Sequence, residues 1–244
     1  MSENALILLI IFMPIVAFLY ASVGHGGASS YITLLTLAGI ASAQVKPTAL
    51  ILNMAVSAIA FAFYYKASNF NWRLFIMLAV FSIPASYFGG KITVNETLYR
   101  QLLGVLLLFP IARFLNLFPI SDTVKVKQFI WLPPILGLSI GLISGMIGIG
   151  GGIILSPVLL LLGWTNLKQT SALSALFIFV NSCAGLVAKP THFSINNEVY
   201  LLMLLALLGG ILGAYLGAKK FDNKVLKVLL TIVLVVASMK LIIQ

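Results

Sequence analysis

The chain has 244 residues, of which 61% are hydrophobic and 8% are charged, and its mean hydropathy is +1.13. A soluble globular protein of this size needs far more polar surface than this composition supplies, which excludes a soluble enzyme or binding domain. We therefore expect an all-α, polytopic membrane protein embedded in the lipid bilayer. The formal net charge of +10 is interpreted as a bias of the loops, and no nucleic-acid partner is expected.

Hydrophobic segments recur along the whole chain. A membrane helix needs about 20 apolar residues to cross a hydrocarbon core of about 30 Å. Eight long segments are candidate spans: Ala5–Val23, Leu50–Tyr65, Leu74–Gly90, Leu98–Leu117, Phe129–Ile147, Ala172–Ala188, Val199–Ala218 and Val225–Ile243. Two shorter segments, Ala28–Gly39 and Ile153–Gly163, are expected to be broken or re-entrant helices, and whether they cross the membrane fully stays open.

Each short segment follows a glycine cluster. The clusters are Gly24-His25-Gly26-Gly27 in the first half and Gly148-Ile149-Gly150-Gly151-Gly152 in the second. Glycine weakens helices and exposes backbone N–H groups, so a break of this kind inside a membrane is tolerated only where it is buried or lines a cavity. Two such breaks at corresponding positions point to a transport site. Close packing of helices through small residues is the alternative role for these glycines.

The repeat extends past the glycines. Lys46-Pro47-Thr48 follows the first short segment, and Lys168-Gln169-Thr170 follows the second. The halves are therefore residues 1–120 and 125–244, which together form one transmembrane domain. Each half has an odd number of net crossings, so we expect two inverted repeats.

The positive-inside rule orients the chain. One side of the expected topology carries Lys66, Arg73, Arg113, Lys125, Lys127, Lys168, Lys219, Lys220, Lys224 and Lys227. The other side carries Lys46, Lys91, Arg100, Lys189 and Lys240. The first side is therefore predicted to be cytoplasmic, with Trp72, Trp131 and Trp164 at its interface. Both termini are then predicted to lie outside a cell membrane, of the prokaryotic inner-membrane type.

The acidic residues lie outside the predicted spans. They are Glu3, Glu96, Asp122, Glu198 and Asp222, each at a terminus or in a loop. The membrane interior therefore lacks a carboxylate that would bind a cation, ligate a metal or carry a proton. We expect no catalytic residue, metal site or cofactor, and the balance shifts toward an anionic or neutral substrate.

The glycine breaks supply donors for such a substrate. The first N–H groups of a helix lack partners within the helix, and the helix dipole is positive at this end. Hydroxyl groups lie just beyond each break, and glycine N–H groups beside hydroxyls suit a small oxyanion. The candidate substrate-binding residues are Gly24, His25, Gly26, Gly27, Ser29, Ser30, Asn53, Gly148, Gly150, Gly151, Gly152, Ser156 and Asn181.

Several of these side chains have two readings that the sequence leaves open. His25, which Ile149 replaces in the second cluster, either contacts substrate or a proton, or is a neutral imidazole bonded to a carbonyl. Asn53, Asn181 and the neighbouring Ser57, Ser174 and Ser182 either face the cavity or join helices by hydrogen bonds. Lys46 and Lys168, beside Thr48 and Thr170, either steer anions at the two entrances or reach toward the membrane surface.

The chain resembles the TauE/SafE sulfite exporter family. The resemblance rests on the duplicated Gly-x-Gly-Gly motif, the helices ending in Gly39 and Gly163, the Lys-x-Thr starts and the 244-residue length. The first copy departs from the pattern in having His25, and in having Ser30-Tyr31 where the second copy has Ser156-Pro157. The resemblance covers essentially the whole chain and implies transport of sulfur-containing anions such as sulfite, thiosulfate or organosulfonates.

The sequence thus predicts a secondary transporter of a small sulfur-containing anion that works by alternating access, and no enzyme chemistry. A passive anion channel and a membrane scaffold whose glycines only pack helices are the alternatives. With no acidic residue in the spans, coupling to H⁺ uses His25 or a proton carried by the substrate, and coupling to Na⁺ uses helix-end carbonyls. The exact substrate, the direction of transport, the coupling ion and the oligomeric state stay open.

Overall fold

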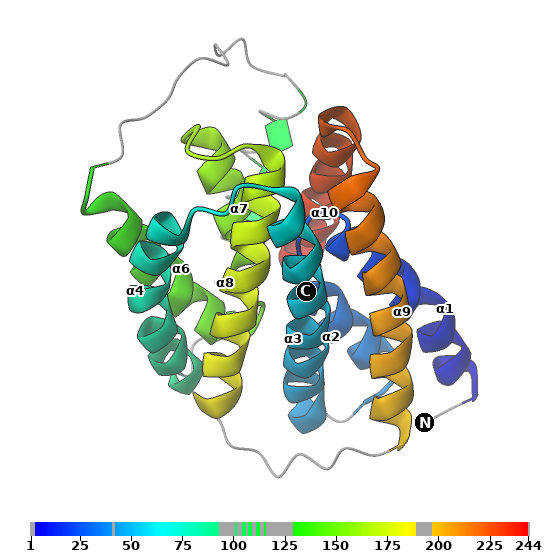
Figure 1. The fold of residues 1–244 in the computed structure, drawn as a ribbon. Helices are drawn as coiled ribbons and strands as arrows, with labels where there is room; N and C mark the ends of the chain where they lie inside the picture. Colours follow the sequence, from blue (N-terminus) through cyan, green and yellow to red (C-terminus); the bar gives the residue numbers. More distant parts are fainter. Residues whose placement is uncertain are drawn as a thin grey trace.

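The computed structural model describes residues 3–40, 42–92, 129–188 and 197–243, together with residues 101, 104, 105, 107, 108, 111, 112 and 115. Within these residues the regular structure is entirely helical (Figure 1). Most of the predicted span Leu98–Leu117 and all of the expected linker 118–127 lie outside the described residues. So do the loop positions Glu96, Arg100, Arg113, Asp122, Lys189 and His192.

The helices of the first half are α1 (Glu3–Ala21), α2 (Ala28–Leu37), α3 (Ser42–Ala67) and α4 (Trp72–Lys91). Those of the second half are α6 (Leu132–Ile147), α7 (Gly152–Leu161), α8 (Leu167–Ala188), α9 (Asn197–Lys219) and α10 (Asn223–Ile243). Both short helices are present where glycine and hydropathy predicted them.

Two long helices start before the apolar spans that hydropathy predicted. Helix α3 begins at Ser42 and α8 at Leu167, each several residues before the expected spans Leu50–Tyr65 and Ala172–Ala188. Polar side chains in these first turns do not prevent helix formation, because a lysine at such a position finds backbone acceptors. Lys46 donates to Met146 O at 3.1 Å, and Lys168 donates to Ala218 O at 3.0 Å.

Four helical segments of the described chain are long and apolar enough to cross a membrane: Gln44–Ala67, Trp72–Lys91, Leu167–Ala188 and Tyr200–Lys219. The apolar segments Leu6–Ala21, Ala28–Leu37, Leu132–Ile147 and Gly152–Leu161 are shorter. Large apolar side chains such as Ile76, Val80, Leu204 and Leu208 are exposed on the outer faces of these helices. An exposed apolar surface of this extent suits a lipid environment.

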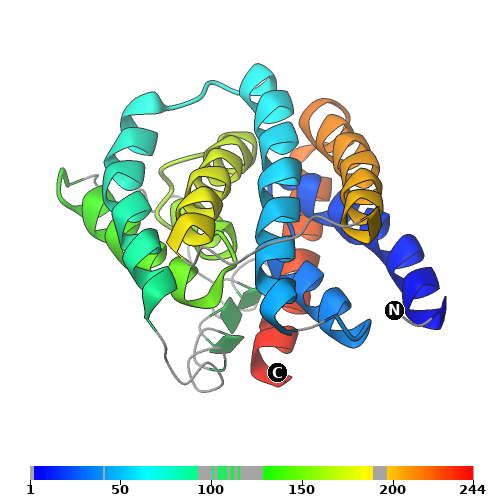
Figure 2. The same cartoon turned by 90° about the horizontal axis from the view of Figure 1, so that it is seen from below.

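Helices α3 and α8 pack against each other at the centre of the bundle (Figures 1 and 2). On one side of this pair α4 packs on α8 and on α6, and on the other side α9 packs on α3 and on α1. The helix pair at each edge therefore combines one helix from each half of the chain. The two short helices lie inside this frame, α2 against α3 and α7 against α8.

Glycines allow the edge pairs to pack closely. On α6 they are Gly137, Gly141 and Gly145, which face the backbone of α4 at Leu78, Ser82 and Ser86. On α9 they are Gly209, Gly213 and Gly217, which face the backbone of α1 at Pro14 and Phe18 and that of Ser22 just after α1. A methyl group at any of these positions would overlap a carbonyl oxygen of the neighbouring helix. The small-residue packing role therefore applies to these helical glycines.

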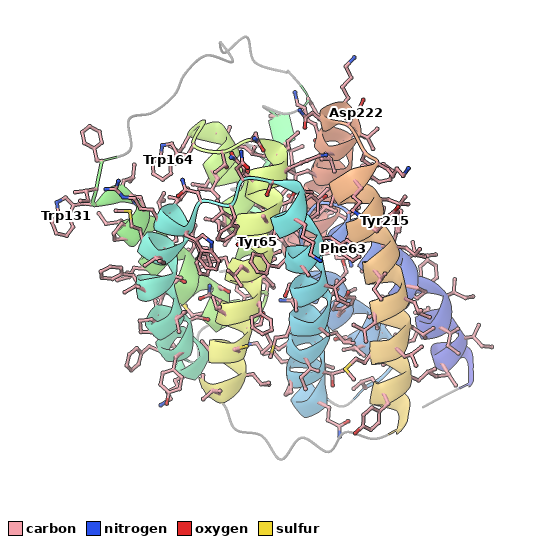
Figure 3. All side chains as sticks on the ribbon, in the orientation of Figure 1. Phe63, Tyr65, Trp131, Trp164, Tyr215 and Asp222 are labelled. Atoms are coloured by element: carbon pink, nitrogen blue, oxygen red, sulfur yellow. The ribbon has the colours of Figure 1, made fainter. Side chains whose placement is uncertain are left out.

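One end of the bundle gathers the end of α3, the start of α8 and the turn between α9 and α10. A polar depression of about 630 Å³ lies there, lined by Lys66, Ala67, Ser68, Asn69, Asn166, Lys168, Gln169, Phe221, Asp222 and Asn223. Trp131 and Trp164 lie at the same end as Asp222 (Figure 3). The helix directions bring Arg73, Lys219 and Lys224 to this end, and Lys46 and Lys91 to the other. These five basic residues therefore lie at the ends to which the loop charges assigned them.

Candidate functional site

The two glycine breaks share one backbone design. Gly24 and Gly27 have φ of 78° and 98°, and Gly148, Gly150 and Gly151 have φ of 84°, 76° and 78°. These left-handed conformations favour glycine because a side chain there would be strained. Gly27 is the N-cap of α2 and Gly151 the N-cap of α7. The glycines thus turn the chain sharply so that a new helix starts inside the bundle.

The matching helix starts also correct one sequence correspondence. Ser30 lies three residues after the N-cap Gly27, whereas Ser156 lies five residues after the N-cap Gly151. Ser156 therefore corresponds to Ile32, and the two hydroxyls are not at equivalent positions.

Each break packs against the long central helix of the other half. A methyl group on Gly24 would overlap the backbone of Ser171 in α8. A methyl group on Gly148 would lie 2.8 Å from Lys46 Cε in α3. The breaks are buried by this reciprocal packing, which satisfies the requirement for irregular backbone in a membrane protein.

Asn53 of α3 lies between the two breaks. Its Oδ1 accepts a hydrogen bond from Ala28 N at 3.1 Å, and its Nδ2 donates to Ser182 Oγ at 2.8 Å. A methyl group on Gly26 would overlap the Asn53 amide, and one on Gly150 would lie 2.6 Å from Asn53 Nδ2. The side chain therefore contacts both breaks and fixes the start of α2.

His25 joins the first break to the second. Its Nε2 lies 3.0 Å from Gly152 O and 3.2 Å from Ser156 Oγ, and its Nδ1 lies 3.1 Å from Val23 O. Ser156 Oγ in turn lies 2.7 Å from Ser174 Oγ of α8. A neutral imidazole carries one N–H and donates to only one of the two carbonyls, whereas the protonated ring donates to both. The bond to a backbone carbonyl, one of the two expected readings of His25, is present.

Backbone donors at both breaks lack partners. Among the described residues, no acceptor receives a hydrogen bond from the N–H groups of Gly26, Gly27, Ser29, Gly150, Gly151 and Gly152. All six residues are buried. A buried donor without a partner costs about 1–3 kcal/mol, which makes the two breaks the candidate site for a group that accepts hydrogen bonds. The N-termini of α2 and α7 at the two breaks add favourable partial positive charge for an anion.

Two buried hydroxyls accompany the N-cap glycines. A methyl group on Gly27 would lie 3.0 Å from the Tyr31 hydroxyl oxygen, and one on Gly151 would lie 3.2 Å from Ser144 Cβ. Neither hydroxyl has a hydrogen-bond partner within the described part of the chain. Neither residue was predicted from the sequence as a site residue. Their signal was their spacing, since Tyr31 follows Gly27 by four residues and Ser144 precedes Gly148 by four.

A second polar cluster lies at the first turn of α2. Tyr20 Oη is 3.1 Å from Ser29 Oγ and accepts a hydrogen bond from Ser30 Oγ at 2.9 Å. Lys240 Nζ of α10 donates to Ser30 Oγ at 2.9 Å. The structure therefore brings the predicted residues Ser29 and Ser30 together with Tyr20 and Lys240, which were not predicted as site residues.

Asn181 does not join these groups. Its Nδ2 donates to Ser82 Oγ at 3.1 Å and to Phe177 O at 2.8 Å, and its backbone O accepts from Ser86 Oγ at 3.0 Å. Asn181 thus links α8 to α4, which is the helix-joining reading of this residue. Its buried Oδ1 has no partner among the described residues.

The four predicted entrance residues lie at helix starts. Lys46 and Lys168 donate to carbonyls in the last turns of α6 and α9, as given above, and so lie at the negative ends of two helix dipoles. Thr170 Oγ1 lies 2.7 Å from Thr165 Oγ1, and the buried Thr48 Oγ1 has no partner in the described segments. A steering role for these residues stays a prediction.

No group of three or more His, Cys, Asp or Glu residues within the described ranges is arranged to hold a metal ion.

A family model described as "Sulfite exporter TauE/SafE" matches residues 8–241. The chain belongs to the TauE/SafE family. This TauE/SafE protein is 33% identical over 233 residues to "Probable membrane transporter protein y4hK" of Sinorhizobium fredii, covering 93% of this chain and 94% of that protein. It is 26% identical over 231 residues to "Probable membrane transporter protein YdhB" of Bacillus subtilis, covering 91% and 93% of the two chains. No solved structure matches the chain.

A third relative, "Probable membrane transporter protein MJ0441" of Methanocaldococcus jannaschii, is 30% identical over 152 residues, covering 59% of this chain and 54% of that protein. The family, these relatives and the apolar helices identify a multi-pass membrane protein of a transporter family. Such a protein takes a small-molecule substrate, and membership fits a role other than catalysis.

Proposed function

We propose that this protein is a secondary transporter of a small sulfur-containing anion, of the sulfite, thiosulfate or organosulfonate type, and that it works by alternating access. One observation carries the proposal: the buried N–H groups of Gly26, Gly27, Ser29 and Gly150–Gly152, at the two breaks, have no acceptor in the described chain. An oxyanion has several acceptor oxygens that can receive hydrogen bonds from such donors.

The sulfur chemistry is supported by the description of the matching family model and by the resemblance of the repeated motif. A sulfite or sulfonate group carries three oxygens on one sulfur atom. These oxygens diverge, so that donors from α2 and from α7 reach different oxygens of one group. Rejection of cations follows from the same geometry, because both helix N-termini repel positive charge.

We also propose that residues 1–120 and 125–244 are inverted repeats, with eight long helices, around this site. Three observations support the repeats: α2 and α7 each have 10 residues, each follows a left-handed glycine, and each break packs on the central helix of the other half. The edge pairs α1 with α9 and α4 with α6 exchange partners between the halves. Rocking one such pair against the centre is the motion that alternating access needs.

The proposed orientation has both termini outside, in a cell membrane of the prokaryotic inner-membrane type, because more described lysines lie at the end with Lys66 and Lys168. Single cysteines on a Cys183→Ser background test it. Cysteines near Lys91 and Lys189 should react with an impermeant reagent in intact cells, and those near Lys66, Lys125 and Lys220 only after permeabilisation. Labelling near Ser121 in intact cells would contradict this orientation.

For energy coupling we favour a proton carried by the substrate, or Na⁺, over a proton carried by His25. The second break has Ile149 at the position of His25, so a shared mechanism of the two breaks does not use the imidazole. His25 is also engaged with Gly152 O and Val23 O, which makes it a link between breaks.

The test of the proposed function begins with purified protein and sulfite, thiosulfate, sulfate, organosulfonates and carboxylates. A ligand that binds the folded state raises the apparent melting temperature. Proteoliposomes then measure flux of the anion that binds. Uptake against its gradient, driven by an ion gradient, is expected. Flux only down the gradient would favour the passive channel, and absence of anion binding would favour the scaffold.

A further inference from the structure

Lys240 reaches into the bundle. It lies near the end of α10, and loop charge alone assigned it to the membrane surface. Its Nζ instead donates to Ser30 Oγ at 2.9 Å, and Ser30 is buried, with 1% of its surface exposed. Ser30 belongs to the first turn of α2. The ammonium group is therefore at the helix N-terminus that carries the unpaired N–H groups of the first break.

The hydrogen bonds around Lys240 run in one direction. The ammonium group can only donate, so Ser30 Oγ accepts from it and donates its own hydrogen to Tyr20 Oη. Tyr20 Oη then has its hydrogen free to donate to Ser29 Oγ. The Ser29 hydroxyl hydrogen is left without an acceptor in the described chain. The chain of bonds thus ends in a donor beside the unpaired Ser29 N–H.

The charge environment of Lys240 differs from that of the other two inward-bonded lysines. Lys46 and Lys168 donate to carbonyls in the last turns of helices, where the dipole is negative. Lys240 lies at the first turn of α2, where the dipole is positive and repels a cation. Ser30 Oγ is its one hydrogen-bond partner among the described residues. Among the acidic residues, Asp222 is the one whose side chain the structure describes. It lies just before the start of α10, whereas Lys240 lies near the end of that helix.

A second observation at the same helix start points to a ligand. The Tyr31 hydroxyl is fully buried and has no partner in the described part of the chain, and it lies beside the N-cap Gly27. A buried hydroxyl without a partner is costly, as are the unpaired N–H groups around it. Donors, a hydroxyl and an ammonium group therefore converge on the start of α2.

We propose that Lys240 is the counter-charge for the transported anion. On this proposal, which rests on the proposed function, an oxyanion group at the start of α2 binds Lys240 Nζ, the Ser29 hydroxyl and the N–H groups of Gly27 and Ser29. The ammonium group selects for charge, whereas the backbone donors select for oxygen atoms. A doubly charged anion such as thiosulfate then depends on Lys240 more than a singly charged one such as methanesulfonate.

The test compares variants of one helix. Purified wild type, Lys240→Met, Lys240→Arg and Lys224→Met are titrated with thiosulfate and with methanesulfonate by calorimetry. Lys224 is the matched control, since it is an exposed lysine of the same helix. Lys240→Met should weaken thiosulfate binding at least about tenfold, as expected for loss of a charge-assisted hydrogen bond, and methanesulfonate binding less. Lys240→Arg should stay close to wild type, and Lys224→Met should match it.

A chemical rescue separates charge from folding. Lys240→Cys on a Cys183→Ser background should bind thiosulfate weakly, and alkylation with 2-bromoethylamine, which rebuilds an ammonium side chain, should restore binding. The alkylation experiment tests the role of Lys240 if the Lys240→Met variant does not yield a monodisperse protein. Wild-type affinity in Lys240→Met, or no gain on alkylation of Lys240→Cys, would overturn the role of Lys240 while leaving the proposed function intact. Failure of the wild type to bind any anion would instead overturn the proposed function.

Discussion

The two glycine breaks share one backbone conformation but differ in their side chains and hydrogen bonds. Both turn through left-handed glycines and start a short helix. The first break contains His25, and its Ala28 N–H is already held by Asn53. The second contains only glycine and isoleucine, and its glycine N–H groups from Gly150 to Gly152 have no acceptor in the described chain.

The left-handed glycine backbone is therefore what the two breaks have in common. The side-chain hydrogen bonds of His25 and Asn53 are made by the first break alone, since Ile149 stands where the second break would have its histidine. Hydrogen bonds from His25 and Asn53 position the first break against the second. The second break offers donors and carries no side chain that competes for them. Substitutions of His25 and Asn53 should therefore act through lost hydrogen bonds, and substitutions of the break glycines through lost space.

The largest effect is expected for added side chains at the breaks. Gly26→Val would overlap Asn53, and Gly151→Val would meet Phe177 and Ile140 in addition to backbone strain at a φ of 78°. Both variants should insert into the membrane and lose anion uptake in proteoliposomes, because a β-branched side chain fills the space before the N–H groups.

Gly185→Ala is the matched control for these variants. Gly185 lies in α8, and a methyl group there would have its nearest neighbour at 3.9 Å. Its uptake should equal that of the wild type. Normal uptake by both valine variants would show that the breaks only pack helices.

The next largest effect separates the two buried asparagines. Asn53→Ala should weaken anion binding by about tenfold, since the start of α2 loses its acceptor and the two breaks lose a common contact. Asn181→Ala removes bonds between α8 and α4 and should lower the melting temperature with little change in affinity. Thermal unfolding and calorimetric titration of both variants measure this contrast. Equal losses of affinity would mean that the breaks are not the site.

A smaller effect is expected for the lysines at the helix starts. Lys46→Met and Lys168→Met each remove a cation from a helix C-terminus, an interaction worth about 0.3–1 kcal/mol. Initial uptake rates should fall by no more than about fivefold, with a stronger loss at low ionic strength if the lysines steer anions. A loss as large as that of Gly26→Val would mean that these lysines contact the substrate directly.

The smallest effect on coupling is expected for His25. A histidine has an unperturbed pKa of about 6.5. If it carried the coupled proton, His25→Gln would remove the dependence of uptake on pH between about pH 5.5 and 7.5. We expect that dependence, or a dependence on Na⁺, to persist in the variant. Flux of a sulfonate that stays ionised over this range is the measurement, and pH-gradient-driven uptake that disappears in His25→Gln would contradict our preference.

Local chemistry explains what the sequence predicted well. The starts of α2 and α7 follow from glycines that adopt left-handed φ, and the ends follow from Gly39 and Gly163 with φ of 73° and 67°. Such signals act within a few residues and need no knowledge of the fold. Hydropathy likewise located the four described helices that are long and apolar enough to cross a membrane, because burial in lipid depends on composition along one helix.

Tertiary contacts explain what the sequence did not predict. Lys240 is separated from Ser30 by 210 residues, and no local pattern distinguishes it from a lysine at the membrane surface. Asn53 and Asn181 look alike in sequence, yet one faces the breaks and the other faces α4. The hydroxyls of Tyr31 and Ser144 become candidates for ligand contact only because the fold places them beside the N-cap glycines. Facing directions of this kind depend on how the helices pack.

The central claim is that backbone N–H groups at the two breaks bind the anion. Selective ¹⁵N labelling of glycine makes this directly measurable, because the chain has 20 glycines and the break glycines can be assigned by single substitutions. On titration with thiosulfate, the amide resonances of Gly26, Gly27, Gly150, Gly151 and Gly152 should shift with one common affinity, while those of the packing glycines Gly137 and Gly209 should not. Binding of thiosulfate that leaves the five break resonances unchanged would contradict the account.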